Sequence, residues 1–133
     1  MEYKDLISRA ILARDRAYAP YSHFKVGASL LCANGKIYDG CNVENASYGA
    51  TICAERGAFA SAIANGERDF VAIAIVGGLN GTSEPCFPCG ICRQFMSELC
   101  GNEFEVVLCN GDSTHVYKLD ELLPYGFNKD SLV

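Results

Sequence analysis

Residues 26–42 decide the fold. They begin with Val26-Gly27-Ala28-Ser29-Leu30-Leu31-Cys32, continue through Ala33-Asn34-Gly35-Lys36 and end with a second short segment at 36–42. The first seven residues are apolar or small and stop at a turn signal, which predicts a strand. An Asn-Gly pair is the strongest short signal for a tight hairpin turn. We therefore expect residues 26–32 and 36–42 to form an antiparallel pair of strands.

Helical and strand patterns alternate around this hairpin. Apolar spacing predicts a first helix from residue 6 to residue 17, which stops before Tyr18-Ala19-Pro20 because a residue before proline avoids the helical region. Further helices are expected at 53–65 and 90–99 and from about residue 119, with strands at 70–76, 105–109 and 114–117 and a loop at 77–88. The alternation and the hairpin together predict an α/β fold, a three-layer α-β-α sandwich with a mixed five-stranded sheet.

Length and composition indicate one catalytic domain over residues 1–133. The chain has 133 residues, of which 50% are hydrophobic, so a core can form without disulfides. Its formal net charge is −5 and its Lys and Arg residues do not cluster. Because nucleic-acid binding depends on basic side chains that neutralise phosphates, we expect no nucleic-acid partner.

The sequence also predicts a cytoplasmic protein that does not enter a membrane. No apolar run approaches the roughly 18 residues of a spanning helix, and the charged residues 1–5 are unlike a signal peptide. Eight cysteines are many for such a chain. Without an export signal they indicate metal binding or catalysis more than a disulfide framework.

Two cysteine motifs occur at the starts of predicted helices. One is Cys53-Ala54-Glu55-Arg56, and the other is Pro88-Cys89-Gly90-Ile91-Cys92-Arg93-Gln94. Free N–H groups and the positive end of the helix dipole stabilise thiolates, the form of cysteine that binds zinc. Three protein ligands leave the fourth tetrahedral position open to water, as in catalytic zinc sites.

The Cys-x-x-Cys pair is not specific by itself. It is also typical of redox proteins and of half a structural zinc site. The glutamate two residues after Cys53 is the deciding feature. A ligand two residues before a glutamate, followed by Pro-Cys-x-x-Cys, is the signature of zinc nucleobase deaminases, in which the glutamate is a general acid and base and not a ligand.

The chain resembles the small, homotetrameric zinc-dependent cytidine deaminases over nearly its whole length. Besides the two cysteine motifs, the resemblance rests on 18–28 (YAPYSHFKVGA), 40–48 (GCNVENASY) and 121–127 (ELLPYGF). It implies a cytidine deaminase-like fold, one Zn²⁺ per subunit and active sites shared between the subunits of a homotetramer.

Residues 86–92 contain two overlapping Cys-x-x-Cys pairs, Cys86 with Cys89 and Cys89 with Cys92. The family motif continues into Gly and then Cys-Arg-Gln, which only the second pair places correctly. We therefore expect Cys53, Cys89 and Cys92 to hold the zinc and Cys86 to be a loop residue. The remaining cysteines lie in apolar runs or at element ends, where buried free thiols are expected: Cys32, Cys41, Cys100 and Cys109.

The resemblance implies hydrolytic deamination of free cytidine and deoxycytidine to uridine and deoxyuridine with release of ammonia, a reaction of pyrimidine salvage. In this reaction zinc-bound hydroxide attacks C4 of the pyrimidine, and Glu55 shuttles the protons. Arg56 is implied to donate hydrogen bonds to ligand sulfur, which offsets the negative charge of three thiolates.

Substrate contacts also follow from the resemblance. Asn42 and Glu44 are implied to bind the sugar hydroxyls, and an amide with a carboxylate is suited to such groups. Phe24 is implied to pack against the base, and the Ala54 backbone to bond the edge of the base. Phe127 is implied to close the pocket of a neighbouring subunit, with Tyr48 and Ala46 beside that junction between subunits.

The sequence is also compatible with other functions. A deaminase for a cytosine-nucleoside antibiotic of the blasticidin type shares the cysteine motifs, although Asn42, Glu44 and Phe127 favour a plain nucleoside. A deoxycytidylate deaminase needs a phosphate site, against which Glu44 and the negative net charge argue. A non-catalytic zinc-stabilised binding module predicts a fourth protein ligand and no role for Glu55.

Overall fold

The computed structural model describes residues 3–78, 84–110 and 113–132. Its centre is a five-stranded sheet with the order β2-β1-β3-β4-β5. The strands are β1 (Lys25–Cys32), β2 (Ile37–Cys41), β3 (Phe70–Gly78), β4 (Glu105–Asn110) and β5 (Ser113–Lys118). Strand β1 is antiparallel to β2 and β3, β3 is parallel to β4, and β4 is antiparallel to β5. The predicted mixed five-stranded sheet is confirmed.

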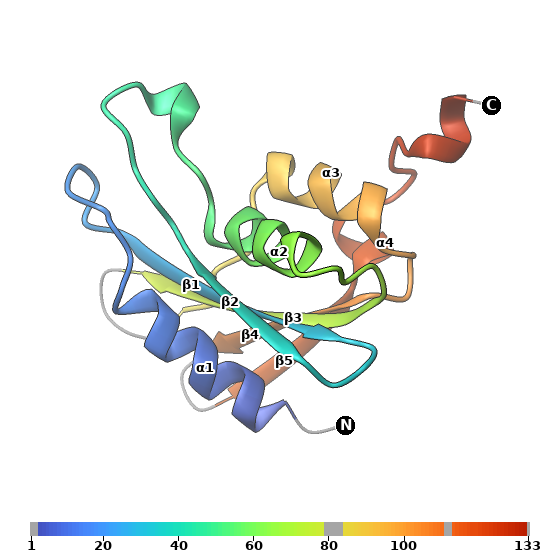
Figure 1. Ribbon diagram of the computed structural model, residues 1–133, viewed down its shortest axis with the longest axis horizontal. Helices are drawn as coiled ribbons and strands as arrows, with labels where there is room; N and C mark the ends of the chain where they lie inside the picture. The colour runs from blue at the N-terminus through green and yellow to red at the C-terminus, as the bar shows by residue number, and fades with distance from the viewer. Residues whose placement is uncertain (1–2, 79–83, 111–112, 133) are drawn as a thin grey trace.

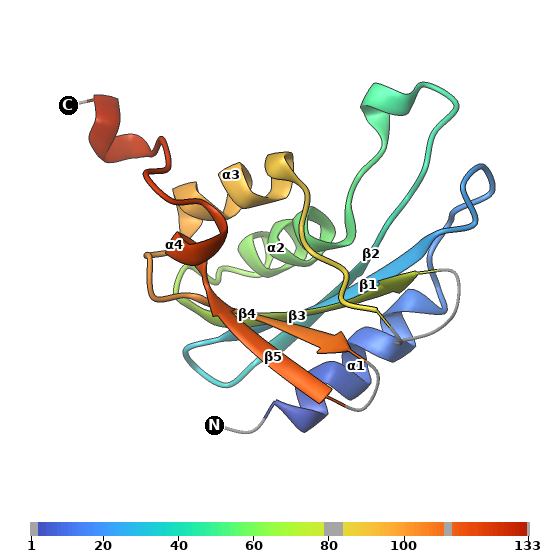
Figure 2. The ribbon, with the colours of Figure 1, turned by 180° about the vertical axis from the view of Figure 1, so that it is seen from behind.

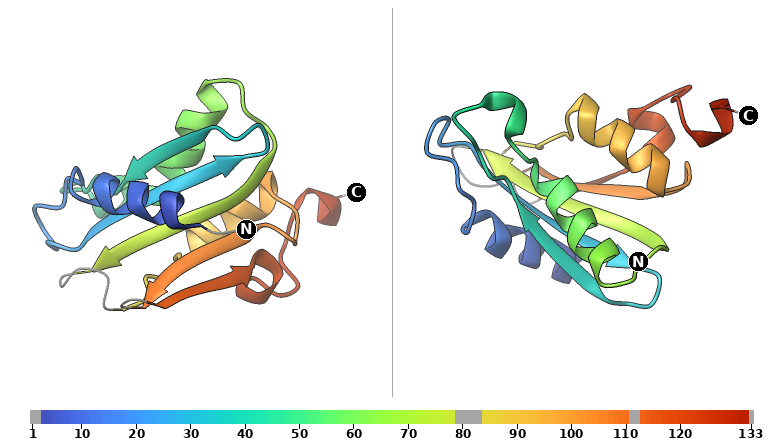
Figure 3. Two further views of the ribbon diagram at one scale, coloured as in Figure 1. Left: turned by 90° about the horizontal axis from the view of Figure 1, so that it is seen from below. Right: turned by 45° about the horizontal axis from the view of Figure 1, so that its top comes forward.

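Helices cover both faces of the sheet. Helix α1 (Lys4–Arg14) lies on one face, and α2 (Ala54–Ala64) and α3 (Gly90–Leu99) lie on the other (Figures 1 and 2). The shorter elements are η1 (Tyr48–Ala50), α4 (Leu119–Leu122) and η2 (Lys129–Leu132). In Figure 3, α1 lies in front of the sheet in the left view, and α2 lies in front of it in the right view. The predicted α-β-α arrangement is therefore confirmed.

Each face of the sheet has its own apolar core. Beneath α2 and α3, Phe59 is fully buried and meets the rings of Phe70 and Phe95 edge-on. Beneath α1, Leu6 and Ala10 pack with buried residues of β3 and β4. These two cores hold the helices at fixed positions over the sheet, which fixes where their first residues lie.

Two glycines let the helices approach the sheet closely. A Cβ atom on Gly27 would lie 2.1 Å from the carbonyl oxygen of Ala10, and one on Gly40 would lie 2.4 Å from that of Ala54. Real Cβ atoms essentially never approach other atoms so closely, so larger residues at these positions would push the helices away. Gly40 therefore seats the first turn of α2, the turn that carries Glu55, against β2.

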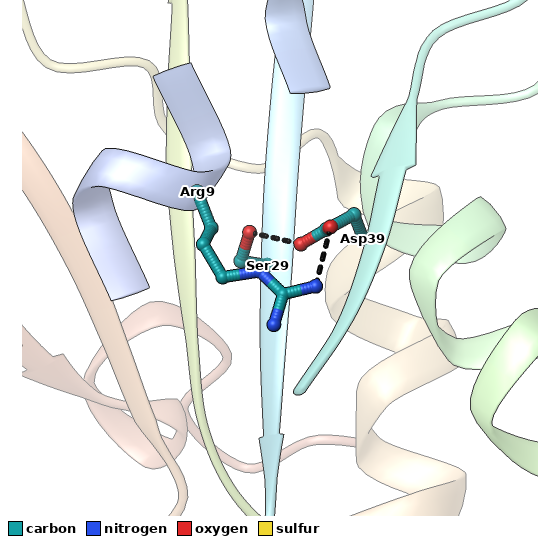
Figure 4. A network of polar contacts seen from close by, with 3 residues as sticks. All are labelled: Arg9, Ser29 and Asp39. Carbon is teal, nitrogen blue, oxygen red and sulfur yellow. Dashed lines mark hydrogen bonds and ion pairs between the residues drawn. The ribbon is translucent and has the colours of Figure 1, made fainter. Parts of the chain in front are cut away.

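A polar network fastens α1 to the edge of the sheet. Ser29 and Asp39 are paired across β1 and β2, and the Ser29 hydroxyl donates to Asp39 Oδ1 over 2.7 Å. Arg9 reaches down from α1 and donates to Asp39 Oδ2, also over 2.7 Å (Figure 4). Ser29 is fully buried, so its hydroxyl needs this partner.

The largest differences at the C-terminal ends of predicted elements concern the first helix and the third strand. Helix α1 ends at Arg14, three residues before the predicted end, because the chain turns after it and the Tyr18 amide donates to the carbonyl of Asn42. Strand β3 continues to Gly78, into the predicted loop, because Gly78 pairs with Lys25 of β1. Residues 79–83 of that loop lie outside the described part of the chain.

None of the helices in the described part of the chain combines the length and the hydropathy that a membrane crossing requires.

Candidate metal centre

The two cysteine motifs meet at the N-termini of α2 and α3. Cys53 is the residue just before α2, Cys89 is the residue just before α3, and Cys92 lies in the first turn of α3. All three sulfur atoms lie within 4.8 Å of one another, and those of Cys53 and Cys89 are 3.8 Å apart. The folding of the chain therefore brings together the three cysteines that the sequence predicts as metal ligands.

The local charge favours a thiolate at Cys53. Its hydrogen bond with Cys92, followed by those with Arg56 and Cys89, lowers the pKa of Cys53 to about 5. The free N–H groups at a helix start act in the same direction. Among the described residues no fourth Cys, His, Asp or Glu joins the group. Three sulfurs with an open side fit a zinc ion that keeps one position for another ligand.

Cys86 is not part of this group. Its sulfur lies against the backbone of β3, where a Cβ on Gly77 would approach it to 2.9 Å. Burial raises the pKa of Cys86 to about 11, so it stays a neutral thiol. The other four cysteines are free thiols, of which Cys32 and Cys109 are buried and Cys41 and Cys100 are half-buried.

Glu55 lies beside the sulfurs and is almost completely buried, with 4% of its surface exposed. Burial raises the pKa of its carboxyl group. A buried carboxyl group next to a metal-ligand set is typical of a proton-transfer group.

Arg56 contacts the ligand set directly. Its Nη2 atom donates to the sulfur of Cys53 over 3.8 Å and to the carbonyl of Thr51 over 3.2 Å. Its Nε atom is buried and has no hydrogen-bond partner in the described part of the chain. The guanidinium therefore places a positive charge beside the Cys53 sulfur.

Arg93 fastens the segment that carries Cys89, a contact that the sequence analysis missed. Its Nε atom donates to the carbonyl of Pro88 over 2.8 Å, and its Nη1 atom donates to the carbonyl of Leu122 over 2.7 Å. Pro88 is fully buried. The arginine next to Cys92 thus ties the ligand segment to α4.

Asn42 and Glu44 lie after β2 and hold the loop before β1. Asn42 donates to the carbonyl of Phe24 and accepts from the amide of Val26, both over 2.8 Å. Glu44 accepts from the amides of Tyr21 and Ser22 and from the Ser22 hydroxyl. The hydroxyl of Ser22 is the main cause of the lowered pKa of Glu44.

A cleft of about 390 Å³ opens beside Glu44, lined by Tyr21, Ser22, Glu44, Asn45, Tyr48 and Thr51. The ring of Tyr48 is exposed and meets that of Tyr21 edge-on, with 6.5 Å between the centroids. Phe24 is partly exposed, Ala46 is exposed and Ala54 is fully buried at the start of α2. The structure thus gathers several predicted substrate contacts on one side of the molecule.

Phe127 is held by its backbone while its ring remains exposed. Gln94 of α3 donates to the Phe127 carbonyl over 2.7 Å, yet 58% of the residue is exposed. The chain after α4 lies near the C-terminal end of α3, away from the loop that joins β2 to α2 (Figures 1 and 3). Within one chain, this segment and that loop stay apart.

Comparison with known proteins agrees with this geometry. Residues 1–108 match the family model described as the cytidine and deoxycytidylate deaminase zinc-binding region. The chain is 48% identical to the cytidine deaminase of Halalkalibacterium halodurans, over 99% of this chain and 98% of that protein. It is 45% identical to the cytidine deaminase of Sporosarcina psychrophila, over 99% of this chain and 96% of that protein.

Solved structures give the same result. The crystal structure of cytidine deaminase from Burkholderia pseudomallei superposes with a TM-score of 0.88 at 52% identity, over 96% of this chain and 100% of that one. That of the Mycobacterium tuberculosis enzyme superposes with a TM-score of 0.83 at 36% identity, over 96% and 98%. A zinc-binding deaminase domain whose three cysteines are positioned to hold the ion thus accounts for both the sequence and the fold. The chain belongs to the cytidine deaminase family.

Proposed function

We propose that the protein hydrolyses cytidine and deoxycytidine to uridine and deoxyuridine and releases ammonia. The observation that carries this proposal is the position of the buried Glu55 carboxyl group beside Cys53 and Cys92, two members of the three-cysteine group. Such an arrangement provides both a metal site with an open position and a proton carrier next to it. The similarity to named cytidine deaminases supports the same reaction.

In the proposed mechanism Glu55 moves every proton. When bound, zinc polarises a water molecule, which is the nucleophile of this reaction class. Glu55 accepts the proton that this water loses and delivers it to N3 of the pyrimidine. The oxygen of this water forms a bond to C4. Glu55 then takes the second proton from that oxygen and transfers it to the exocyclic amine, so that the C4 carbonyl forms, the C4–N bond breaks and ammonia leaves as a neutral molecule. Burial keeps Glu55 away from bulk water, so the protons stay on this path.

Arg56 adjusts the charge of the site. Three thiolates carry more negative charge than one divalent ion neutralises, which makes a bound water less acidic. The hydrogen bond from Arg56 to Cys53 withdraws part of that charge. We propose that this contact holds the site near neutrality and keeps the water reactive at physiological pH.

The nucleoside is proposed to lie along the loops before β1 and after β2. Asn42 and Glu44 bind the sugar hydroxyls, Phe24 packs on the base, and the Ala54 backbone bonds its edge. A carboxylate at the sugar repels a phosphate, so Glu44 favours a nucleoside over deoxycytidylate. The three-cysteine group also argues against a purely structural zinc module, which needs a fourth protein ligand.

We further propose that residues 1–133 act as one catalytic domain and that four copies form a cytoplasmic homotetramer with shared active sites. Tyr48 and Phe127 support the assembly, because large apolar side chains that are exposed in one chain are typical of interfaces. Eight free cysteines support a reducing compartment.

The proposal is tested with purified, zinc-loaded protein and cytidine. The ultraviolet absorbance should fall as uridine forms, and ammonia should appear in equal amount. Zinc analysis of the same sample should give about one ion per subunit. A zinc-loaded protein that leaves both cytidine and deoxycytidine unchanged would rule out the proposed reaction.

A further inference from the structure

One hydroxyl group links the two loops that line the cleft. The Ser22 hydroxyl donates to Glu44 Oε2 and accepts from the amide of Phe24 over 3.0 Å. The amide of Ser22 also donates to Glu44 Oε1 over 3.1 Å. Ser22 therefore joins the carboxylate proposed to bind the sugar to the ring proposed to pack on the base.

These contacts determine how many hydrogen bonds the Glu44 carboxylate can accept from a ligand. A carboxylate has about four lone-pair sites. Within the described part of the chain three are used, by the Tyr21 amide, the Ser22 amide and the Ser22 hydroxyl. The carboxylate is thus fixed in orientation and retains about one acceptor site, enough for a single hydroxyl group. Without the Ser22 hydroxyl, Oε2 would lose its partner within the protein and turn more freely.

The same hydroxyl holds Phe24. The Phe24 amide bonds the Ser22 hydroxyl, and the Phe24 carbonyl accepts from Asn42 over 2.8 Å. His23, which lies between Ser22 and Phe24 in the sequence, has a φ of 60°. This is the left-handed region, which is uncommon for residues other than glycine. A backbone held there needs restraint from its surroundings. Ser22 and Asn42 supply that restraint on either side of Phe24.

We propose that Ser22 is a positioning residue for the nucleoside sugar, acting through Glu44 and, to a lesser extent, through Phe24. The inference rests on the proposed function, since it assigns Ser22 to the binding of the 3′-hydroxyl of that substrate. Its role is to fix the one free acceptor site of Glu44 before the substrate arrives, which lowers the cost of ordering on binding. Ser22 takes no part in moving protons.

The test compares two substrates that differ by one hydroxyl. Deoxycytidine has a 3′-hydroxyl and 2′,3′-dideoxycytidine lacks it. Ser22→Ala and Ser22→Cys should raise KM for deoxycytidine by roughly tenfold, the effect of losing a hydrogen bond to a charged group, with a much smaller change in kcat. KM for dideoxycytidine should change less than about threefold, because that substrate lacks the 3′-hydroxyl that Glu44 is proposed to bind. Ser22→Thr, which keeps a hydroxyl, should restore the wild-type KM.

Further variants separate positioning from general damage. Ser8→Ala removes an exposed hydroxyl on α1 that donates to the carbonyl of Lys4, and it should change neither KM. In a Glu44→Gln background, Ser22→Ala should raise the KM for deoxycytidine little further. Zinc content and melting temperature, measured on every variant, identify any that fails to fold.

An equal rise in KM for deoxycytidine and dideoxycytidine would overturn the positioning role. So would an unchanged KM for deoxycytidine in both Ser22→Ala and Ser22→Cys. A wild-type enzyme that deaminates neither cytidine nor deoxycytidine would instead overturn the proposed function and this inference with it.

Discussion

Cys86 and Cys89 lie three positions apart but differ in their surroundings. The sulfur of Cys89 lies close to those of Cys53 and Cys92, whereas Cys86 is half-buried and its sulfur packs against β3. Cys89→Ser should lower the zinc content to well below one ion per subunit, because a serine hydroxyl is a poor zinc ligand. Cys86→Ser should keep zinc close to stoichiometric. Metal analysis of the two purified variants decides the ligand set, and loss of zinc in Cys86→Ser would contradict it.

Glu55 can be separated from the metal by an isosteric change. Glu55→Gln leaves the three sulfurs in place, so zinc should stay bound and the nucleoside should still bind. Turnover should fall by at least ~10²-fold, the lower end of the range for general acid and base catalysis. Glu98→Gln, on the exposed side of α3, is the matched control and should keep normal turnover. Near-normal turnover in Glu55→Gln would remove this residue from the mechanism.

The position of a side chain can be predicted from sequence where its motif is contiguous. Cys53 and Glu55 are two positions apart at one helix start, so their proximity follows from local structure. Cys89 and Cys92 are placed in the same way by the start of α3. Ser22 and Arg93 were missed as functional residues because their partners are distant: Glu44 is 22 residues from Ser22, and Leu122 is 29 residues from Arg93. Such contacts depend on how whole loops pack.

At the scale of elements, the hydroxyl of Ser29 should contribute measurably to stability. It is fully buried and donates to Asp39, which also binds Arg9 of α1 (Figure 4). The ion pair itself is partly exposed and therefore weak. Ser29→Ala should lower the free energy of unfolding by about 1 kcal/mol, the typical value of one hydrogen bond.

The measurement for Ser29 is urea unfolding followed by circular dichroism. Ser8→Ala, whose hydroxyl is exposed on α1, should change the midpoint little and serves as the control. An unchanged midpoint in Ser29→Ala would show that Arg9 alone satisfies Asp39.

The sequence predicts which segments are helices and which are strands more accurately than it predicts where each one ends. Asn34-Gly35 marks the first hairpin correctly, and Gly35 adopts the positive φ of 89° that the turn requires. The ends of α1 and β3 were misplaced, because they are set by pairing with residues far along the chain, Asn42 and Lys25. Local periodicity carries no information on such pairing.

At the scale of the whole molecule, the exposed aromatic rings are the feature that one chain does not explain. Tyr48 is 79% exposed and Phe127 is 58% exposed, and they belong to segments at different ends of α3. A ring left in water forfeits the free energy of burial. Packing against another copy of the chain would recover it, which is why we propose that the active sites are shared.

Phe127→Ala should weaken nucleoside binding and leave zinc content unchanged. Leu12→Ala, an equally exposed change on α1, should affect neither. Mixing provides the stronger test. When Phe127→Ala and Glu55→Gln subunits are dissociated and reassembled together, some pockets combine an intact Glu55 with an intact Phe127 from the neighbouring subunit. Such mixtures should contain active sites with a KM close to wild type, although neither parent has them. If the kinetics of the mixture equal the weighted sum of those of the two parent variants, each chain completes its own site. An active monomer in sedimentation would show the same.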